Sequence, residues 1–117
     1  MIANLAVGFV ALLHFYILVL EMFFWTKAPG MRAFGMTPEK ARDSAVLAAN
    51  QGLYNGFLAA GLVWGLVHPD LMFGLQVKLF FLGCIAIAGL YGAVTAKRSI
   101  LFVQTVPAAI TVVLLLV

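Results

Sequence analysis

Four long apolar stretches, separated by short polar connections, constrain what this 117-residue chain can fold into. They cover residues 2–25, 45–67, 71–95 and 99–117. A helix needs about 20 mostly apolar residues to cross the hydrocarbon core of a bilayer. Hydrophobic residues make up 65% of the chain and charged residues only 9%, whereas a soluble domain is about half apolar and about a quarter charged. We therefore predict an all-α membrane protein: one domain, residues 1–117, folded as a four-transmembrane-helix bundle.

The second helix is expected to begin before the apolar stretch that it contains. The segment Thr37-Pro38-Glu39-Lys40 supplies a capping threonine, a proline for the first helical position and an early acid, which is a typical helix start. The predicted helices are therefore residues 2–25, 38–67, 71–95 and 99–117.

Positive charge predicts how the chain is oriented. The first and third connections hold all but one of the basic residues: Lys27, Arg32, Lys40, Arg42, Lys97 and Arg98. The second connection, residues 68–70, has none. Because basic connections stay in the cytoplasm, both termini are expected outside the cell (N-out/C-out). The net charge of +3 then indicates attraction to the lipid bilayer and its inner leaflet, and no nucleic acid is expected as a partner.

On this topology, polar residues from all four helices fall at a similar depth, in the cytoplasmic half of the membrane. His14 and Glu21 are seven residues apart, so they differ by only about 20° around their helix. The second helix carries two i,i+4 pairs, in which Asn50 precedes Tyr54 and Gln51 precedes Asn55. The third and fourth helices contribute Tyr91 and Gln104. We expect these residues to face one another across an inward-opening pocket.

Ionisable residues inside a membrane are costly and usually functional, which makes His14 and Glu21 the candidate catalytic pair. The six other polar residues are candidates for ligand binding: Asn50, Gln51, Tyr54, Asn55, Tyr91 and Gln104. An acid and a base suit isomerisation or epoxide opening of a small lipophilic molecule. The chain has no Gly-rich phosphate loop, CxxC or HExxH motif, so neither a metal nor a cofactor is predicted.

Other interpretations stay open at this point. The chain has the size of the small multidrug resistance transporters, which also rely on one membrane-embedded glutamate in the first helix, so a proton-coupled transporter is an alternative. A structural or accessory subunit is another, because the polar residues could serve only as interhelical hydrogen bonds, each contributing about 0.6 kcal/mol. His14 could also be an axial haem ligand, for which one histidine suffices. Four short helices leave little room for a pocket, and a homo-oligomer is therefore expected.

Three further features predict helix packing. Gly52 with Gly56, and Gly61 with Gly65, have the small-xxx-small spacing that lets helices approach closely in lipid. Pro107 frees the carbonyl of Val103, which predicts a kink in the fourth helix. Lys78 is expected to extend to the outer membrane surface, since the 17 apolar residues after it are long enough to span alone.

Two segments resemble a known family. The run Asn50-Gln51-Gly52-Leu53-Tyr54-Asn55-Gly56 and the first-helix motifs His14-Phe15-Tyr16-Ile17 and Glu21-Met22-Phe23 are similar to those of the DUF1304 family of small bacterial membrane proteins. The resemblance covers essentially the whole chain. It implies a four-helix, multi-pass protein of the bacterial inner membrane, and it assigns no chemistry because the function of the family is unknown.

Overall fold

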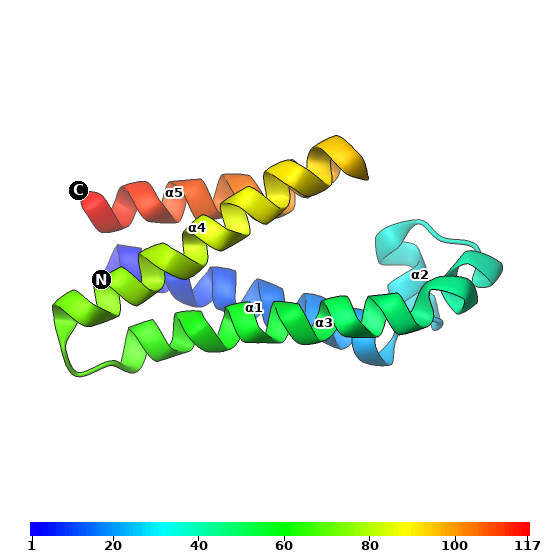
Figure 1. Cartoon of the computed structure of the whole chain (residues 1–117), viewed down its shortest axis with the longest axis horizontal. Coiled ribbons are helices and arrows are strands. Elements are labelled where there is room, and N and C mark those ends of the chain that lie inside the picture. Colours follow the sequence, from blue (N-terminus) through cyan, green and yellow to red (C-terminus); the bar gives the residue numbers. More distant parts are fainter. The chain divides into compact units, whose positions relative to one another are not determined.

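The computed structural model describes residues 1–117, and all regular secondary structure in the chain is helical (Figure 1). The elements are α1 (Ile2–Phe23), α2 (Ala28–Phe34), α3 (Pro38–Val67), α4 (Leu71–Thr95), the π-helix η1 (Leu101–Thr105) and α5 (Val106–Leu116). The bounds of α3 and α4 are those expected from the sequence. The first helix ends at Phe23, two residues earlier than predicted, and α2 was not predicted.

The chain divides into two compact units, which we describe separately. The central unit is Leu12–Ala59, and the terminal unit combines Met1–Ala11 with Ala60–Val117. The central unit contains most of α1, all of α2 and the first part of α3. The terminal unit contains the end of α3 together with α4, η1 and α5.

Side-chain caps explain where the two longest helices begin. Thr37 Oγ1 accepts the backbone N–H of Lys40 at 3.2 Å, and Pro38 follows as the first residue of α3. At the start of α4, Asp70 Oδ1 accepts the backbone N–H of Phe73 at 3.0 Å. Each cap satisfies an N–H group that has no partner within its helix. The helix start predicted at Thr37 and Pro38 is confirmed.

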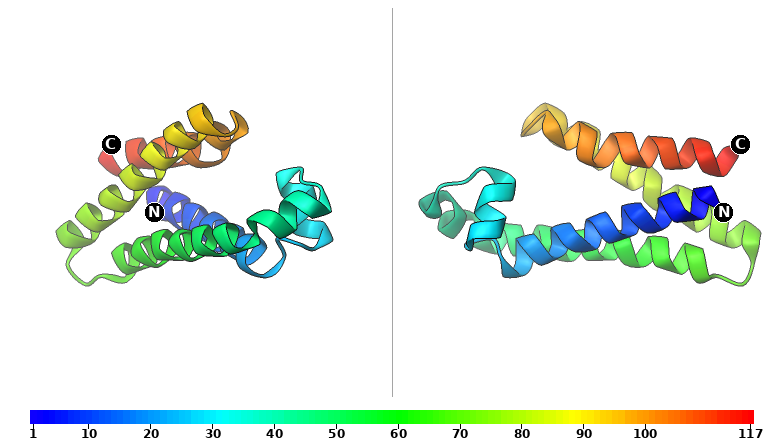
Figure 2. Two further views of the ribbon diagram at one scale, coloured as in Figure 1. Left: turned by 45° about the vertical axis from the view of Figure 1, so that its right-hand side comes forward. Right: turned by 180° about the vertical axis from the view of Figure 1, so that it is seen from behind.

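The connection between α1 and α3 is folded rather than extended, and it contains α2. Gly35 ends this short helix with a φ of 61°, a left-handed conformation that costs a residue with a side chain about 1–2 kcal/mol. The Trp25 ring packs on Phe34 at a centroid distance of 4.8 Å, and its Nε1 donates to Ser44 Oγ at 3.0 Å. Figure 2 shows α2 folded back beside the first turns of α3.

Close packing joins α4 to η1 and α5 in the terminal unit. Thr105 Oγ1 donates to the carbonyl of Ala86 at 3.0 Å, and a Cβ added at Gly89 would collide with Thr105. The irregularity expected before Pro107 is present as a π-helix, in which the N–H of Val106 bonds to the carbonyl of Leu101. A single-turn π-bulge is one way in which a helix accommodates a residue that interrupts the usual hydrogen-bond ladder.

Lys78 has a protein partner that the sequence did not predict. Its side chain is buried, with 9% of its surface exposed, and Nζ donates to Asn4 Oδ1 at 2.9 Å. The sequence predicted only that the amine would extend to the outer membrane surface. In the terminal unit the amine reaches a polar group on α1, and this contact replaces the water that snorkelling would have provided.

Two helices, α1 and α4, are long and apolar enough to cross a membrane. Only 22% and 28% of their most apolar 18-residue windows are buried, and large apolar side chains remain exposed along both: Leu5, Phe9, Leu12, Phe15, Phe80, Ile87 and Leu90. Exposed apolar surface on this scale is typical of contact with lipid or with a partner. The apolar segment Leu101–Leu116 is shorter, and the polar residues near the centre of α3 lower the hydropathy of that helix.

Candidate functional site

The first helix meets α3 in the central unit through one short polar contact. Asn55 Nδ2 donates to Glu21 Oε1 at 2.6 Å and also lies 3.1 Å from the backbone carbonyl of Gln51. The two side chains are 34 residues apart in the sequence. The expectation that Glu21 faces the polar stripe of α3 is therefore confirmed at Asn55.

Two glycines on α3 make this approach possible. A Cβ added at Gly52 would lie 2.6 Å from Met22 Cγ and 3.1 Å from Glu21 Cβ, and one added at Gly56 would lie 2.5 Å from Leu18 Cδ1. Carbon atoms in contact prefer about 3.5–4.0 Å. The close helix approach predicted from the Gly52 and Gly56 spacing is confirmed, and it brings the Asn55 amide within reach of Glu21.

The other polar residues of this stripe make no bond to α1. Asn50 Nδ2 donates to the carbonyl of Val46 on its own helix at 2.8 Å. Gln51 and Tyr54 are exposed, and the Tyr54 ring has Phe57 as a neighbour at a centroid distance of 6.4 Å. These three side chains therefore form an exposed polar surface next to the Glu21–Asn55 bond.

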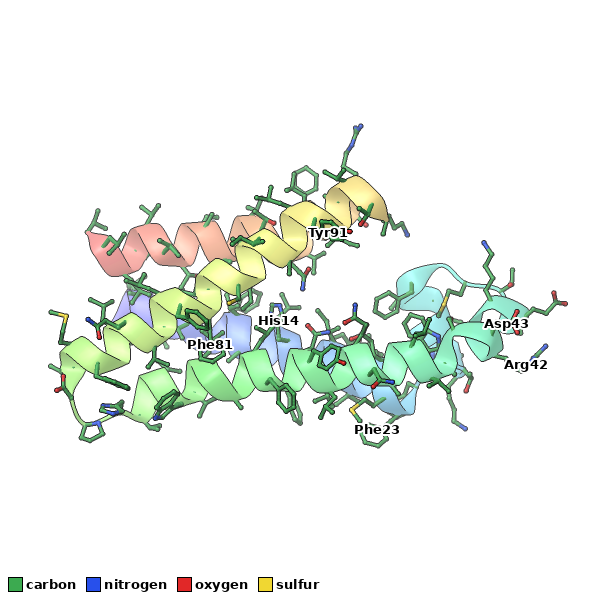
Figure 3. All side chains as sticks on the ribbon, viewed as in Figure 1. His14, Phe23, Arg42, Asp43, Phe81 and Tyr91 are labelled. Carbon is green, nitrogen blue, oxygen red and sulfur yellow. The ribbon has the colours of Figure 1, made fainter.

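His14 is completely buried on α1 (Figure 3). It lies on the same side of the helix as Glu21, but seven residues place the two about 10 Å apart along the axis. They cannot share a hydrogen bond, so the predicted catalytic pair would have to act on opposite ends of a bound molecule. Every buried side-chain nitrogen and oxygen atom in the chain has a hydrogen-bond partner, so ligation of haem by His14 would require an existing bond to be given up.

Tyr91 and Gln104 belong to the terminal unit, whereas Glu21 and Asn55 belong to the central unit. Tyr91, on α4, is 71% exposed, and Gln104, in η1, is half-buried. The sequence analysis also missed a polar contact, the one between Asn4 and Lys78. A signal for it was present: both residues lie near the N-terminal ends of helices whose predicted directions place those ends on the same side of the membrane.

The cluster can bind a hydrogen-bonding group or a cation through Glu21. A carboxylate accepts several hydrogen bonds, and the Asn55 amide supplies one of them here. Because an amide is neutral, this bond does not offset the negative charge of the carboxylate. This chain has no group of three or more His, Cys, Asp or Glu side chains that could hold a metal ion. The arrangement suits proton transfer or the recognition of a polar group on an otherwise apolar molecule.

Comparison with known proteins identifies a family and a relative of this chain. Residues 8–116 match the model of a family described as "Protein of unknown function (DUF1304)". A relative from Lactococcus lactis subsp. lactis (strain IL1403), described as "Uncharacterized protein YpaA", is 34% identical over 97 residues, which cover 81% of this chain and 80% of the relative. No solved structure matches the chain.

Proposed function

We propose that this chain, which belongs to the DUF1304 family, is embedded in a membrane and binds a small lipophilic molecule. In one form of the proposal it also converts that molecule. In this account α1, α3, α4 and the segment formed by η1 and α5 all cross the bacterial inner membrane, with both termini outside. The support is the apolar character of α1 and α4, the exposed apolar side chains and the basic residues of two connections. Within the polar centre of α3, Asn55 has a hydrogen-bond partner on α1.

The observation that carries the proposal is the hydrogen bond between Glu21 and Asn55. A carboxyl group on an apolar, membrane-type helix is expensive to maintain and therefore marks a functional site. Its partner orients it without neutralising it. A hydroxyl group of a lipophile could donate to a free lone pair of the Glu21 carboxylate, and a carbonyl or epoxide oxygen could accept from the carboxyl group in its protonated form. The exposed Asn50, Gln51 and Tyr54 lie on the same stretch of α3 as Asn55.

The chemistry assigned to this site is acid/base chemistry. One carboxyl group is sufficient to take a proton from one carbon of a bound molecule and return it to another, which is an isomerisation. In epoxide opening, an acid protonates the ring oxygen while a base activates water. Because His14 and Glu21 are about 10 Å apart along α1, we assign proton transfer to Glu21. His14 is buried, so it would contact the far end of the ligand only once the ligand displaced the side chains that cover it.

Mass spectrometry of the protein purified in mild detergent tests this proposal. We expect a lipophile to co-purify with the wild type and to be retained at least tenfold less by Glu21→Gln, a loss equivalent to about 1.4 kcal/mol. Glu39→Gln is the matched control because Glu39 lies in the exposed first turn of α3. Equal retention by all three proteins would refute the assignment to Glu21, and a Soret absorbance band would indicate haem instead.

A proton-coupled transporter is the second candidate, and the lack of a cationic partner for Glu21 favours it. Such a carboxylate could bind either a proton or a lipophilic cation, and exchange between them would drive transport. Binding of tetraphenylphosphonium by the wild type and its loss in Glu21→Gln would support this candidate. Retention of a neutral lipophile alone would favour the binding or enzymatic role.

An accessory subunit is the third candidate, favoured by the complete hydrogen bonding of the buried polar atoms. In that case the exposed Asn50, Gln51 and Tyr54 would contact another copy or another membrane protein, because lipid offers them no hydrogen bonds. Cross-linking in native membranes would reveal such a partner. A homo-oligomer that also retains a lipophile would support both the contact between copies and the binding role of the first candidate.

A further inference from the structure

A second buried polar contact lies in the terminal unit, and the proposed function does not use it. Lys78 is 9% exposed on the apolar helix α4, and its Nζ donates to Asn4 Oδ1 at 2.9 Å. A lysine ammonium group has three N–H donors. Asn4 occupies one of them, so the amine keeps the capacity to bind a further acceptor.

Two glycines hold the lysine in this position. A Cβ added at Gly65 would lie 2.5 Å from Lys78 Cγ, and one added at Gly74 would lie 2.7 Å from the carbonyl oxygen of Gly65. The end of α3 and the start of α4 therefore pack closely, and the aliphatic part of Lys78 lies over Gly65. This packing fixes the amine near Asn4 of α1.

No aspartate or glutamate side chain pairs with Lys78 within the terminal unit. Asp70 is the only aspartate or glutamate in that unit, and its side chain caps α4 by accepting the N–H of Phe73. Asp70 and Lys78 are eight residues apart, which corresponds to about 12 Å along the helix axis. A buried cation without an anion is unfavourable, and in a membrane helix it indicates a ligand or a pathway.

We propose that Lys78 and Asn4 bind the phosphate group of an anionic lipid. The site rests on the membrane placement proposed above. Lys78 is about 10 Å along the axis from the start of α4, which brings its amine towards the headgroup region of the outer half. Beside this helix start, Trp64, His68 and Phe73 form an aromatic cluster, with ring centroids 5.7 Å apart for Trp64 and Phe73 and 4.5 Å for His68 and Phe73. Such clusters are typical of the interface between membrane and water.

The chemistry of the site explains why a phosphate is the expected ligand. The ammonium group provides charge and two further donors, and the Asn4 amide nitrogen provides another. Phosphate oxygens accept several such bonds at once. A soluble phosphate would satisfy the same groups, so the test must separate the two sources.

Native mass spectrometry of the protein in nanodiscs that mix phosphatidylglycerol with phosphatidylcholine tests the proposal. We expect the wild type and Lys78→Arg to retain phosphatidylglycerol preferentially, and Lys78→Met to lose at least four-fifths of that preference. Lys97→Met removes an exposed cation from the connection after α4 and is expected to change the preference less than twofold. Millimolar inorganic phosphate is expected to have no effect.

Three results would overturn the lipid site. An unchanged preference in Lys78→Met would show that the lysine does not hold the lipid, and competition by inorganic phosphate would identify a soluble anion as the ligand. If Lys78→Met fails to fold, the wild type still decides, because equal retention of the two lipids contradicts the proposal. Extraction of the wild type from membranes by alkaline carbonate would instead refute the membrane placement on which the site rests.

Discussion

Replacing Gly52 by alanine tests the close contact between α1 and α3 that brings Asn55 to Glu21. The new Cβ would lie 2.6 Å from Met22 Cγ, 3.1 Å from Glu21 Cβ and 3.2 Å from the carbonyl oxygen of Leu18. Forcing an extra carbon into a packed contact costs about 1–3 kcal/mol. Alanine also favours the helix by about 0.5–1 kcal/mol relative to glycine, so the net loss in the free energy of unfolding is about 0–2.5 kcal/mol.

A matched substitution removes the helix-propensity contribution from this estimate. Gly8 lies within α1, and a Cβ added there has nothing within 4 Å. Gly8→Ala should therefore stabilise the protein by about 0.5–1 kcal/mol. The difference between the two variants isolates the contact, and we expect Gly52→Ala to be about 1–3 kcal/mol less stable than Gly8→Ala.

Unfolding by sodium dodecyl sulfate in mixed micelles, followed by the fluorescence of Trp25 and Trp64, measures this difference. The retention of the lipophile in the same preparations shows whether the contact also supports binding. Equal free energies of unfolding for Gly52→Ala and Gly8→Ala, within about 0.5 kcal/mol, would refute the close approach of α1 and α3.

Five further substitutions probe three local contacts. Asn55→Leu should cost about 0.6–1.7 kcal/mol of stability by removing the bond to α1, whereas Asn50→Leu should cost less, because Asn50 bonds only to its own helix; detergent unfolding measures both. Gly35→Ala should destabilise the end of α2 by about 1–2 kcal/mol because φ is 61°, which faster hydrogen exchange there would reveal. Trp25→Phe and Ser44→Ala should each accelerate proteolysis between α1 and α3, since either removes the same hydrogen bond; unchanged cleavage in both would contradict a structural role for that bond.

The sequence was sufficient to predict the long helices because their signals are local. Thr37 caps α3 and Pro38 is its first residue, where the capping rules place them. The seven-residue α2 was missed because it is too short for a periodic apolar pattern. Its boundaries were nevertheless marked by Pro29 near the start and by Gly35 at the end, the usual asymmetry of a short helix.

The candidate site was predicted in part, and the failures have a common cause. The Glu21–Asn55 contact follows from helix periodicity together with the glycines of α3. The environment of Lys78 does not follow from periodicity, because the space around this side chain depends on how Gly65 and Gly74 bring α3 and α4 together. Depth in the membrane alone could not distinguish a lysine that reaches water from one that reaches Asn4.

The most direct test of the central claim is to ask which carboxyl group an apolar reagent can reach in native membranes. The chain has four acidic side chains: Glu21, Glu39, Asp43 and Asp70. If Glu21 lies in the hydrocarbon region at a site for lipophiles, dicyclohexylcarbodiimide should modify it alone, and the co-purifying lipophile should protect it. A water-soluble carbodiimide should modify only the other three. Labelling of Glu21 by the water-soluble reagent, or no labelling by the apolar one, would contradict the proposed intramembrane site.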